Sequence, residues 1–306
     1  MATDWTDRIR LRNLKFLLSL AQTRNLSHSA NLLHTTQPGL SKWLKDLETD
    51  IGLPLFERHA RGLTPTLHGE ALIAHARRIE AQLDRAATDM EALRDGSAGR
   101  VVIGASGAAA SEAAPRAVLE IASRMPNMRI DLMEGTMDRL LTLLSQGDLD
   151  VVIGRSAHDH FDHSSILTEV LYTEPIDLVA RNDHPLFDLP RIGWQEVLQY
   201  RWIVWPRNTP IRKALEAALV SAGRSLPTNY IESNSVIANI ALLNNSTVIG
   251  TASHRATLML ADLGLLRIIP LELAGFGSVS IYWRNDALYP RSIELALECI
   301  RGVVAG

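Results

Sequence analysis

Residues 25–69 constrain the fold of this chain more than any other stretch, because two short helical patterns follow each other across a polar break. Ser27 is a candidate N-cap for the first helix, and Leu26 stands just before that cap, where it can pack against the helix. The second helix begins near Pro38, which suits a first helical turn because proline has no N–H to lose. The two patterns together predict a helix-turn-helix.

The second helix has two faces of opposite character. One carries a stripe of leucines at helical spacing that we expect to face inward: Leu40, Leu44 and Leu47. The other presents donors and acceptors of the kind that meet base edges and phosphates in a major groove: Gln37, Ser41, Lys42 and Lys45. Most polar helix faces are only solvated surfaces, so this face alone leaves both interpretations open.

The residues after the second helix favour the DNA-binding interpretation. Residues 52–54 (Gly-Leu-Pro) turn the chain, and the basic residues Arg58 and Arg61 then precede Gly62. A basic turn beside a recognition helix can lie against the DNA backbone or reach into a minor groove, where arginine is favoured. We therefore expect an all-α winged helix-turn-helix that binds double-stranded DNA.

Six segments within residues 10–69 match one family pattern: Ser29-Ala30, Thr36-Gln37-Pro38, Leu40-Ser41-Lys42, Leu47-Glu48, Leu55-Phe56-Glu57-Arg58, and Leu63-Thr64 through to Gly69. On these segments the chain resembles the LysR-type transcriptional regulators. It departs from their pattern at Ser29, where alanine is usual, and at Thr36, Lys42 and Trp43, where serine, arginine and a polar residue are common. Lys42 lacks the planar fork with which arginine reads guanine. The DNA contacts are expected from Thr36, Gln37, Pro38, Ser41, Lys42, Lys45, Arg58 and Arg61.

Charge is distributed unevenly along the chain. The net charge is −3, but residues 1–69 hold nine Lys/Arg against six Asp/Glu, whereas residues 70–306 hold twenty-two against twenty-eight. This asymmetry suits a DNA reader joined to a domain that does not bind DNA. Because the basic excess is small, dimerisation would be needed to build a useful field.

A heptad seam follows the helix-turn-helix. Residues 66–95 contain no proline, and apolar residues recur at alternating steps of four and three: Leu72, Ala76, Ile79, Leu83, Ala86, Met90 and Leu93. This pattern predicts a long linker helix that forms a homodimer through residues 72–93, with packing on the chain's own C-terminal domain as the alternative. The resemblance favours dimerisation, and it implies a homotetramer, assembled as a dimer of dimers on a bent, partly palindromic site.

Beyond residues 96–99, which we interpret as the domain linker, strand and helix patterns alternate. Strands are expected at 100–104, 128–133 and 150–154 with helices at 112–124 and 137–146, an order that calls for a parallel sheet with right-handed crossovers. A second region has strands near 176–180, 201–204, 229–231, 247–250 and 266–269, and helices near 211–222, 236–244 and 255–263. A strand at 279–283 and a helix at 292–303 close the chain.

This order of elements, with the segment His184-Pro185-Leu186, resembles the α/β, two-lobed, periplasmic-binding-protein-like effector domain of the same family. The resemblance implies three regions: a DNA-binding domain at 1–69, a linker and dimerisation helix at 66–95, and an effector-binding domain at 100–306. Lobe I would hold about 100–172 and 274–306, and lobe II about 173–273. The implied function is a ligand-responsive transcriptional regulator.

Polar groups at strand ends and helix starts suggest where a small molecule would bind, because ligands collect there in open α/β sheets. Lobe I offers Ser106, Thr136 and Arg155, and lobe II offers Arg207, Asn208 and Thr209. We expect a small anionic effector, such as an aromatic or sugar-derived carboxylate. The serine and threonines could instead serve only as helix caps.

Other patterns carry little chemistry. His158, His160 and His163 are closely spaced but lie in a polar stretch without periodicity, so we expect a solvated loop and no metal site. Residues 104–107 lack the flanking pattern of a nucleophile elbow, and we expect no catalytic residues and no cofactor. Cys299 stands in an apolar helical pattern and is expected to be buried.

No signal-peptide run and no apolar stretch of membrane-spanning length is present, so a cytoplasmic protein without membrane contact is expected. Two other functional classes remain possible for residues 100–306. One is a solute-binding transport component, against which the N-terminal module and the missing signal peptide count. The other is an α/β enzyme with a fused helical arm.

Overall fold

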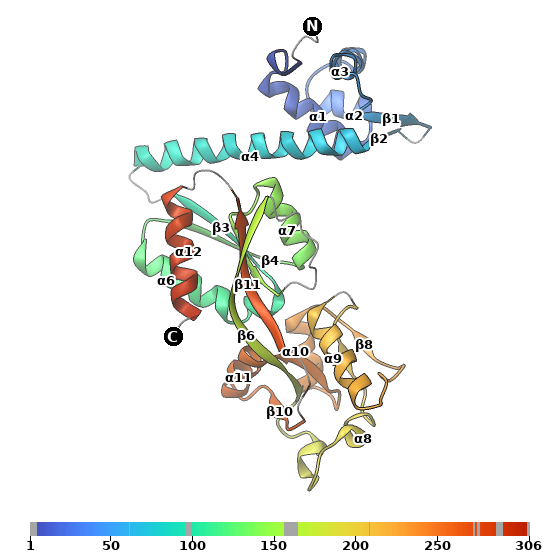
Figure 1. Cartoon of the computed structure of the whole chain (residues 1–306), viewed down its shortest axis with the longest axis vertical. Coiled ribbons are helices and arrows are strands. Elements are labelled where there is room, and N and C mark those ends of the chain that lie inside the picture. Colours follow the sequence, from blue (N-terminus) through green and yellow to red (C-terminus); the bar gives the residue numbers. More distant parts are fainter. Residues whose placement is uncertain are drawn as a thin grey trace. The chain divides into compact units, whose positions relative to one another are not determined.

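The computed structural model describes residues 5–60, 62–95, 99–155, 165–207, 209–271, 273, 276–285 and 290–304. The chain divides into two compact units, the first made of residues 1–91 with 146–148 and the second of residues 92–145 with 149–306. Figure 1 labels the helices and strands of both units. No helix within the described ranges is both long enough and apolar enough to cross a membrane.

The first unit is a winged helix-turn-helix followed by a long helix (Figure 1). Its elements are η1 (Trp5–Asp7), α1 (Leu11–Thr23), α2 (Leu26–Leu32), α3 (Gln37–Ile51), β1 (Phe56–His59), β2 (Gly62–Pro65) and α4 (Leu67–Asp95). Its core joins α1, α3, the two strands and the start of α4 through Leu14, Leu17, Leu20, Leu40, Leu44, Leu47, Leu55, Phe56, Leu63, Ile73 and Ala76. The predicted inward stripe of α3 is confirmed.

The predicted N-terminus is wrong for α2 and confirmed for α3. The expected cap Ser27 is wrong: Asn25 is the N-cap of α2, and its side chain accepts a hydrogen bond from a backbone N–H at 3.0 Å. Leu26 therefore opens the helix instead of preceding its cap. The start of α3 is as predicted, since Thr36 caps it and Pro38 lies in the first turn.

The wing, which we define as β1, β2 and the turn between them, is held by side chains and close backbone contacts. Glu48 accepts hydrogen bonds through Oε1 from the N–H groups of Leu55 (2.8 Å) and Phe56 (3.0 Å), so this carboxylate fixes where β1 begins. Gly62 has φ of +128°, and a Cβ there would collide with the carbonyl oxygen of Arg24. Only glycine fits this turn without strain.

Helix α4 uses its apolar seam in two ways. Near its start, Leu72 is half-buried and Ala76 is buried against the core of the first unit. Farther along, Ile79, Leu83 and Met90 are 43%, 44% and 61% exposed. The side chain of Leu93 lies outside the described part of the chain. A row of exposed apolar residues on one helix face is what a self-pairing seam requires.

The second unit is an α/β fold of two lobes. Its first half contains β3 (Arg100–Ala105), α5 (Gly107–Ala110), α6 (Ala113–Arg124), β4 (Arg129–Glu134), α7 (Met137–Gln146), β5 (Val151–Gly154) and β6 (Ile166–Ala180). Next come η2 (Pro185–Asp188), α8 (Trp194–Val197), β7 (Ile203–Val204), α9 (Pro210–Ser221), β8 (Ile231–Glu232) and α10 (Val236–Asn244). It ends with β9 (Gly250–Ser253), α11 (His254–Asp262), β10 (Arg267–Ile269), β11 (Phe276–Arg284) and α12 (Arg291–Val304).

One sheet runs through both lobes, in the strand order β10-β6-β11-β5-β3-β4, with β9 also paired to β6. Strand β3 pairs in parallel with β4 and β5, which confirms the predicted βαβαβ arrangement of lobe I. The two long strands β6 and β11 pair antiparallel with each other and cross between the lobes (Figure 1). A short parallel pair, β7 and β8, adds to lobe II.

Strand β6 is three times longer than the strand predicted at residues 176–180, because it starts at Ile166 and spans 15 residues. From residue 176 on it lies between other strands, paired with β9 and β10, and there it is buried. Before that it pairs only with β11, and residues such as Thr168 and Val170 are exposed. An edge strand carries fewer apolar residues, so its sequence pattern is weaker.

The family-like segment at 184–186 has a structural role. His184 is buried, and its Nδ1 accepts a hydrogen bond from the N–H of Leu186 at 3.1 Å, while Nε2 lies 3.2 Å from the carbonyl oxygen of Thr247. Burial lowers the pKa of this histidine. A neutral imidazole thus ties the start of η2, which sequence reasoning did not predict, to the interior of lobe II.

The helix that closes the chain belongs to lobe I. Residues of α12 pack with β3, β5, β11 and α6 in one core, in which Cys299 is fully buried. The prediction of a buried thiol is confirmed. Burial raises the pKa of that thiol, which favours its unreactive protonated form.

Candidate functional site

The exposed face of α3 carries the residues expected to contact DNA. Gln37, Pro38, Lys42 and Lys45 are exposed, and Ser41 is half-buried. They lie opposite the leucine stripe that packs into the core. Both lysines are therefore available to a partner. Contact of this face with DNA stays a prediction.

Three of the expected DNA contacts, Arg58, Ser41 and Thr36, already have partners within the unit. Arg58, on β1, donates a hydrogen bond from Nη2 to Ser41 Oγ at 3.0 Å and so joins the wing to α3. Thr36 uses its hydroxyl to accept from the N–H of Gly39 at 3.3 Å. These hydrogen bonds position α3 and the wing in the protein without DNA. Arg61 lies outside the described residues.

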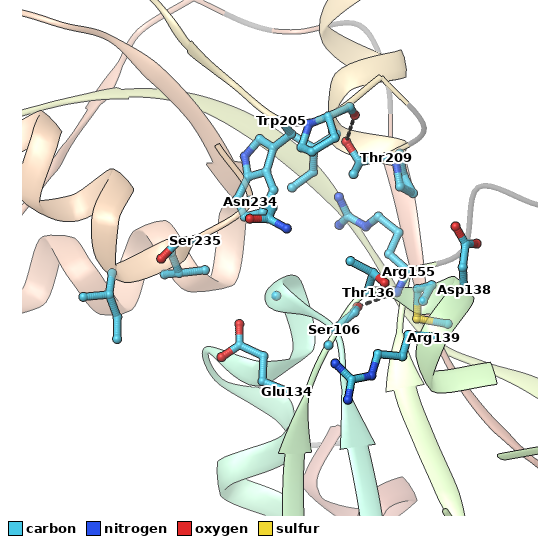
Figure 2. Close-up of a pocket in the computed structure, with 18 residues that line it drawn as sticks. Ser106, Glu134, Thr136, Asp138, Arg139, Arg155, Trp205, Thr209, Asn234 and Ser235 are labelled. Carbon is cyan, nitrogen blue, oxygen red and sulfur yellow. Dashed lines mark hydrogen bonds between the residues drawn. The ribbon is translucent and has the colours of Figure 1, made fainter. Parts of the chain in front are cut away.

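In the second unit, a cleft of about 700 Å³ is lined by residues of both lobes (Figure 2). Lobe I supplies nine lining residues from 106–107, 134–139 and 155, and lobe II supplies nine from 205–206, 209–211 and 234–237. The predicted Ser106, Thr136, Arg155 and Thr209 are all among them. The structure therefore brings four of the six expected effector residues to one cavity.

Three of the longer helices begin at this cleft, in addition to the four-residue helix α5, whose first residue, Gly107, also lines it. The lining includes the first residues of α7 (Met137), α9 (Pro210) and α10 (Val236), together with Thr136, Thr209 and Ser235, which stand immediately before them. The first turn of a helix has N–H groups without partners inside the helix and carries partial positive charge. A cleft that receives three such ends is suited to a negatively charged group.

Arg155 is the most deeply buried charged residue that reaches the cleft. Its side chain is 3% exposed, and its Nη2 donates to Oε1 of the equally buried Glu174 at 2.9 Å. Burial lowers the pKa of Arg155 and raises that of Glu174. Glu174 also accepts from the N–H of Arg255, at the start of α11, at 2.8 Å. Ser106 Oγ accepts from the Arg155 N–H at 3.3 Å (Figure 2).

Two donor groups of Arg155, Nε and Nη1, are buried without a hydrogen-bond partner. The side chain extends from beside Ser106 toward lobe II (Figure 2). A Cβ at Gly277 would lie within 3 Å of three Arg155 side-chain atoms, so the glycine on β11 makes room for the guanidinium. Buried donors without partners are costly, and a bound acceptor would remove that cost.

The side-chain charges of the cleft balance. Glu134 and Asp138 oppose Arg139 and Arg155, and Arg155 is further neutralised by Glu174. Arg139 and Glu134 both lie on the lobe I side of the cleft (Figure 2). Any preference for an anion must therefore come from helix ends and buried donors rather than from net charge.

The remaining lobe II predictions have different outcomes. Thr209 caps α9: its hydroxyl donates to the Pro206 carbonyl at 2.7 Å and accepts from the Arg212 N–H at 3.4 Å. Arg207 is exposed and does not line the cleft, so the structure does not bring it to the expected site. Arg207 instead forms a hydrogen bond with Tyr230. Hydrogen bonds from Arg212 and Arg207 lower the pKa of that tyrosine. Asn208 lies outside the described residues.

Within the described ranges, no group of three or more His, Cys, Asp or Glu side chains could hold a metal ion. The histidines at 158, 160 and 163 lie outside those ranges.

Comparison with known proteins decides the family. Residues 11–70 match the model of the bacterial regulatory helix-turn-helix protein, lysR family, and residues 94–305 match the LysR substrate binding domain. The chain belongs to the LysR family of transcriptional regulators. Its relatives are named as transcriptional regulators, and this family is not enzymatic.

Among LysR-type relatives, the HTH-type transcriptional regulator GbpR of Azospirillum brasilense is 30% identical over 296 residues, covering 96% of this chain and 86% of that protein. GalR of Pseudomonas putida is 30% identical over 295 residues, covering 96% and 74%. CbnR solved with its target DNA has a TM-score of 0.67 at 19% identity, covering 96% of this chain and 100% of that one. Full-length OxyR from Pseudomonas aeruginosa has a TM-score of 0.62 at 21% identity, covering 97% and 94%.

Two departures from the LysR-type pattern have structural explanations. Ser29, where alanine is usual, is fully buried, but its hydroxyl shares a 2.6 Å hydrogen bond with Thr23. Trp43, where a polar residue is usual, packs edge-on against Phe16 with 5.2 Å between ring centroids. Both side chains tighten the helix-turn-helix of this LysR-type regulator without occupying the exposed face of α3.

Sequence reasoning missed most of the lobe II side of the cleft. Trp205, Asn234 and Ser235 line it (Figure 2), as does Arg139 from lobe I. The helix at 236–244 was predicted, and Ser235 is its N-cap, accepting from the Ala238 N–H at 3.2 Å. The predicted helix start and its serine cap were therefore the sequence signal for the contribution of α10 to the cleft of this LysR-type fold.

The buried ion pair predicts a non-additive effect on stability. Changing either Arg155 or Glu174 alone to Met should lower the free energy of unfolding by about 3–5 kcal/mol, because the remaining charge is buried without its partner. The double variant should lose less than the sum. Urea denaturation followed by circular dichroism measures all three. The exposed pair Arg301–Glu169 is the control, and Arg301→Met should cost about 1 kcal/mol or less. Strictly additive losses would mean that the two charges do not depend on each other.

Proposed function

We propose that this LysR-type regulator responds to a small carboxylate bound in the cleft between its two lobes. The observation that carries the proposal is the convergence of the first turns of α7, α9 and α10 on one cavity, with α7 from lobe I and the other two from lobe II. A carboxylate is small, planar and able to accept several N–H bonds at once. Arg155 Nη1 and Nε offer two further buried donors without partners.

The remaining walls favour an effector with an apolar body. Trp205, Val236 and Ile237 line the lobe II side, and Met137 lines the lobe I side. Small-molecule sites are mostly apolar with a few placed polar groups, and this cleft has that character. An aromatic or sugar-derived carboxylate remains the class we infer, the aromatic one being favoured by these walls.

Binding to both lobes gives the effector a means of regulation. A ligand shifts a protein between conformations only through a difference in its affinity for them. A carboxylate that touches α7 and α10 together favours the lobe arrangement in which both helix ends reach it. The regulator would transmit that arrangement to the DNA-bound assembly.

The test of the effector class compares matched acids and amides. Calorimetry should detect benzoate or a related carboxylate at least about tenfold tighter than the corresponding amide, which keeps the shape but loses the charge; tenfold corresponds to about 1.4 kcal/mol. Equal affinity for benzoate and benzamide, or tight binding of a cation, would refute an anionic effector.

For DNA, we propose that Gln37 and Ser41 read bases while Lys42 and Lys45 contact phosphates or base edges. CbnR, a protein of the same fold, has been solved with its target DNA. Arg58 would act partly by holding Ser41 in place, since the two are hydrogen-bonded. Thr36 and Pro38 would set the start of α3, and Arg61 would contact the backbone or minor groove.

These roles predict different effects of substitutions on binding to a specific site and on binding to unrelated DNA. Gln37→Ala should cost roughly 1–3 kcal/mol on a site selected from random-sequence DNA and little on unrelated DNA. Lys45→Ala should weaken both similarly and reduce the salt slope by about 1. Fluorescence anisotropy at several salt concentrations measures these effects. Equal losses for Gln37→Ala on both kinds of DNA would remove that residue from base reading.

We also propose that α4 pairs with a copy of itself through the exposed part of its seam, and that such dimers assemble as tetramers. We further propose that the chain divides into the three regions 1–69, 66–95 and 100–306, for DNA binding, dimerisation and effector binding.

Leu83→Asp would place a charge in the seam and should shift the mass measured by light scattering toward the monomer. Leu67→Asp, on the same helix but 79% exposed and outside the seam, is the control. An unchanged mass for a folded Leu83→Asp variant would show that the seam is not the dimer contact.

A further inference from the structure

A second, smaller cavity adjoins the cleft inside lobe II. Its volume is about 40 Å³, and it shares Gly107, Trp205, Ile211 and Val236 with the lining of the larger cleft. One water needs roughly 10–15 Å³ of such volume, so the cavity holds a group of a few atoms and not a separate ligand. It is therefore a side pocket of the cleft.

The side pocket is uncharged and mostly apolar, and two of its polar side chains have an atom without a hydrogen-bond partner. None of its lining residues is charged. Asn239, on α10, is 8% exposed, and Ser253, at the end of β9, is 2% exposed. Asn239 Oδ1 and Ser253 Oγ are both buried without a hydrogen-bond partner.

Two other polar side chains around the side pocket already have hydrogen-bond partners. Ser111 donates its hydroxyl hydrogen to the Gly107 carbonyl at 2.9 Å. Trp205 donates from Nε1 to the Thr251 carbonyl at 2.9 Å, which fixes the indole between the two cavities. Asn239 Oδ1 and Ser253 Oγ thus stand out as the side-chain atoms of this lining that are buried without a hydrogen-bond partner.

Resting on the proposed function, we infer that this side pocket binds a hydroxyl group at the far end of the effector. A hydroxyl donates one hydrogen bond and accepts others, so it can donate to Asn239 Oδ1 and accept from Ser253 Oγ. Unpartnered buried polar atoms destabilise a free protein, and they persist where a ligand satisfies them. The effector is then a hydroxylated carboxylate, with its charge at the helix ends and its hydroxyl in lobe II.

Gly107 controls the junction between the two cavities. A Cβ at this position would lie 3.5 Å from the Trp205 ring and 3.7 Å from Val236, which is ordinary contact. Gly107→Ala is therefore sterically tolerated but narrows the junction. It should reduce the preference for hydroxylated ligands while the acid-to-amide preference persists.

The experiment compares ligand pairs that differ by one hydroxyl: benzoate with 3- and 4-hydroxybenzoate, hexanoate with 6-hydroxyhexanoate, and the corresponding amides. On the full-length protein, calorimetry should show at least one hydroxylated acid binding about tenfold tighter than its parent. In Asn239→Leu the two members of that pair should bind about equally. In Asn244→Leu, which changes an asparagine of the same helix that already bonds the Ile240 carbonyl, the preference should remain.

The outcomes separate the side pocket from the proposed function. Equal binding within every pair, or a hydroxyl preference that survives Asn239→Leu, overturns the side-pocket inference and means that water alone fills it. If amides bind and acids do not, the anionic effector fails, while the hydroxyl preference within the amide pairs still decides the side pocket. If no probe binds, the melting temperature of the free protein decides. Asn239→Leu should raise it by removing an unpartnered buried oxygen, and a lower value overturns the inference.

Discussion

One buried carboxylate holds the effector domain together where its lobes meet. Glu174 accepts from Arg155, which directly follows lobe I strand β5, and from the backbone N–H of Arg255, the second residue of α11 in lobe II. It stands on β6, the strand that crosses between the lobes. Because Arg155 also lines the cleft, a ligand that bonds this guanidinium acts on the same group that ties the crossing strand in place. Under the proposed function, charge pairing at this buried site would couple effector binding to the lobe arrangement.

In the DNA-binding unit, too, polar side chains hold the backbone in place. Glu48 fixes the start of the wing, Asn25 and Thr36 cap the two helices, and Arg58 bonds Ser41 across from the wing to α3. These bonds leave Gln37, Lys42 and Lys45 on the exposed face, where a duplex could meet them. The rigidity of the reader thus comes from residues other than those that we propose to read.

Local patterns predicted much of this molecule from its sequence. The leucine stripe of α3, the proline in its first turn and the helices at 137–146 and 236–244 follow from spacing and caps, which act within a few residues. The family resemblance supplied the two-lobed fold, which comparison with known LysR-type proteins confirms.

What the sequence could not predict depends on contacts between distant residues. The pairing of Arg155 with Glu174 joins two residues that are 19 positions apart in the sequence, and the first half of β6 is recognisable only from its pairing with β11. Ser27 is predicted as a cap from its residue type, but the cap is Asn25, because the turn into α2 places the Asn25 side chain, two residues earlier, against the His28 N–H. Arg207 was placed in the cleft by proximity to Thr209, but its side chain meets Tyr230 instead.

The central claim is that one ligand meets helix ends from both lobes. Hydrogen–deuterium exchange of the full-length protein, with and without a saturating carboxylate, tests it most directly. The account predicts slower exchange of the amides at residues 137–140 of lobe I and at residues 211–213 and 236–239 of lobe II, at the same ligand concentration. Slowing confined to one lobe, or exchange unchanged at all three helix starts while the ligand is bound, would contradict it.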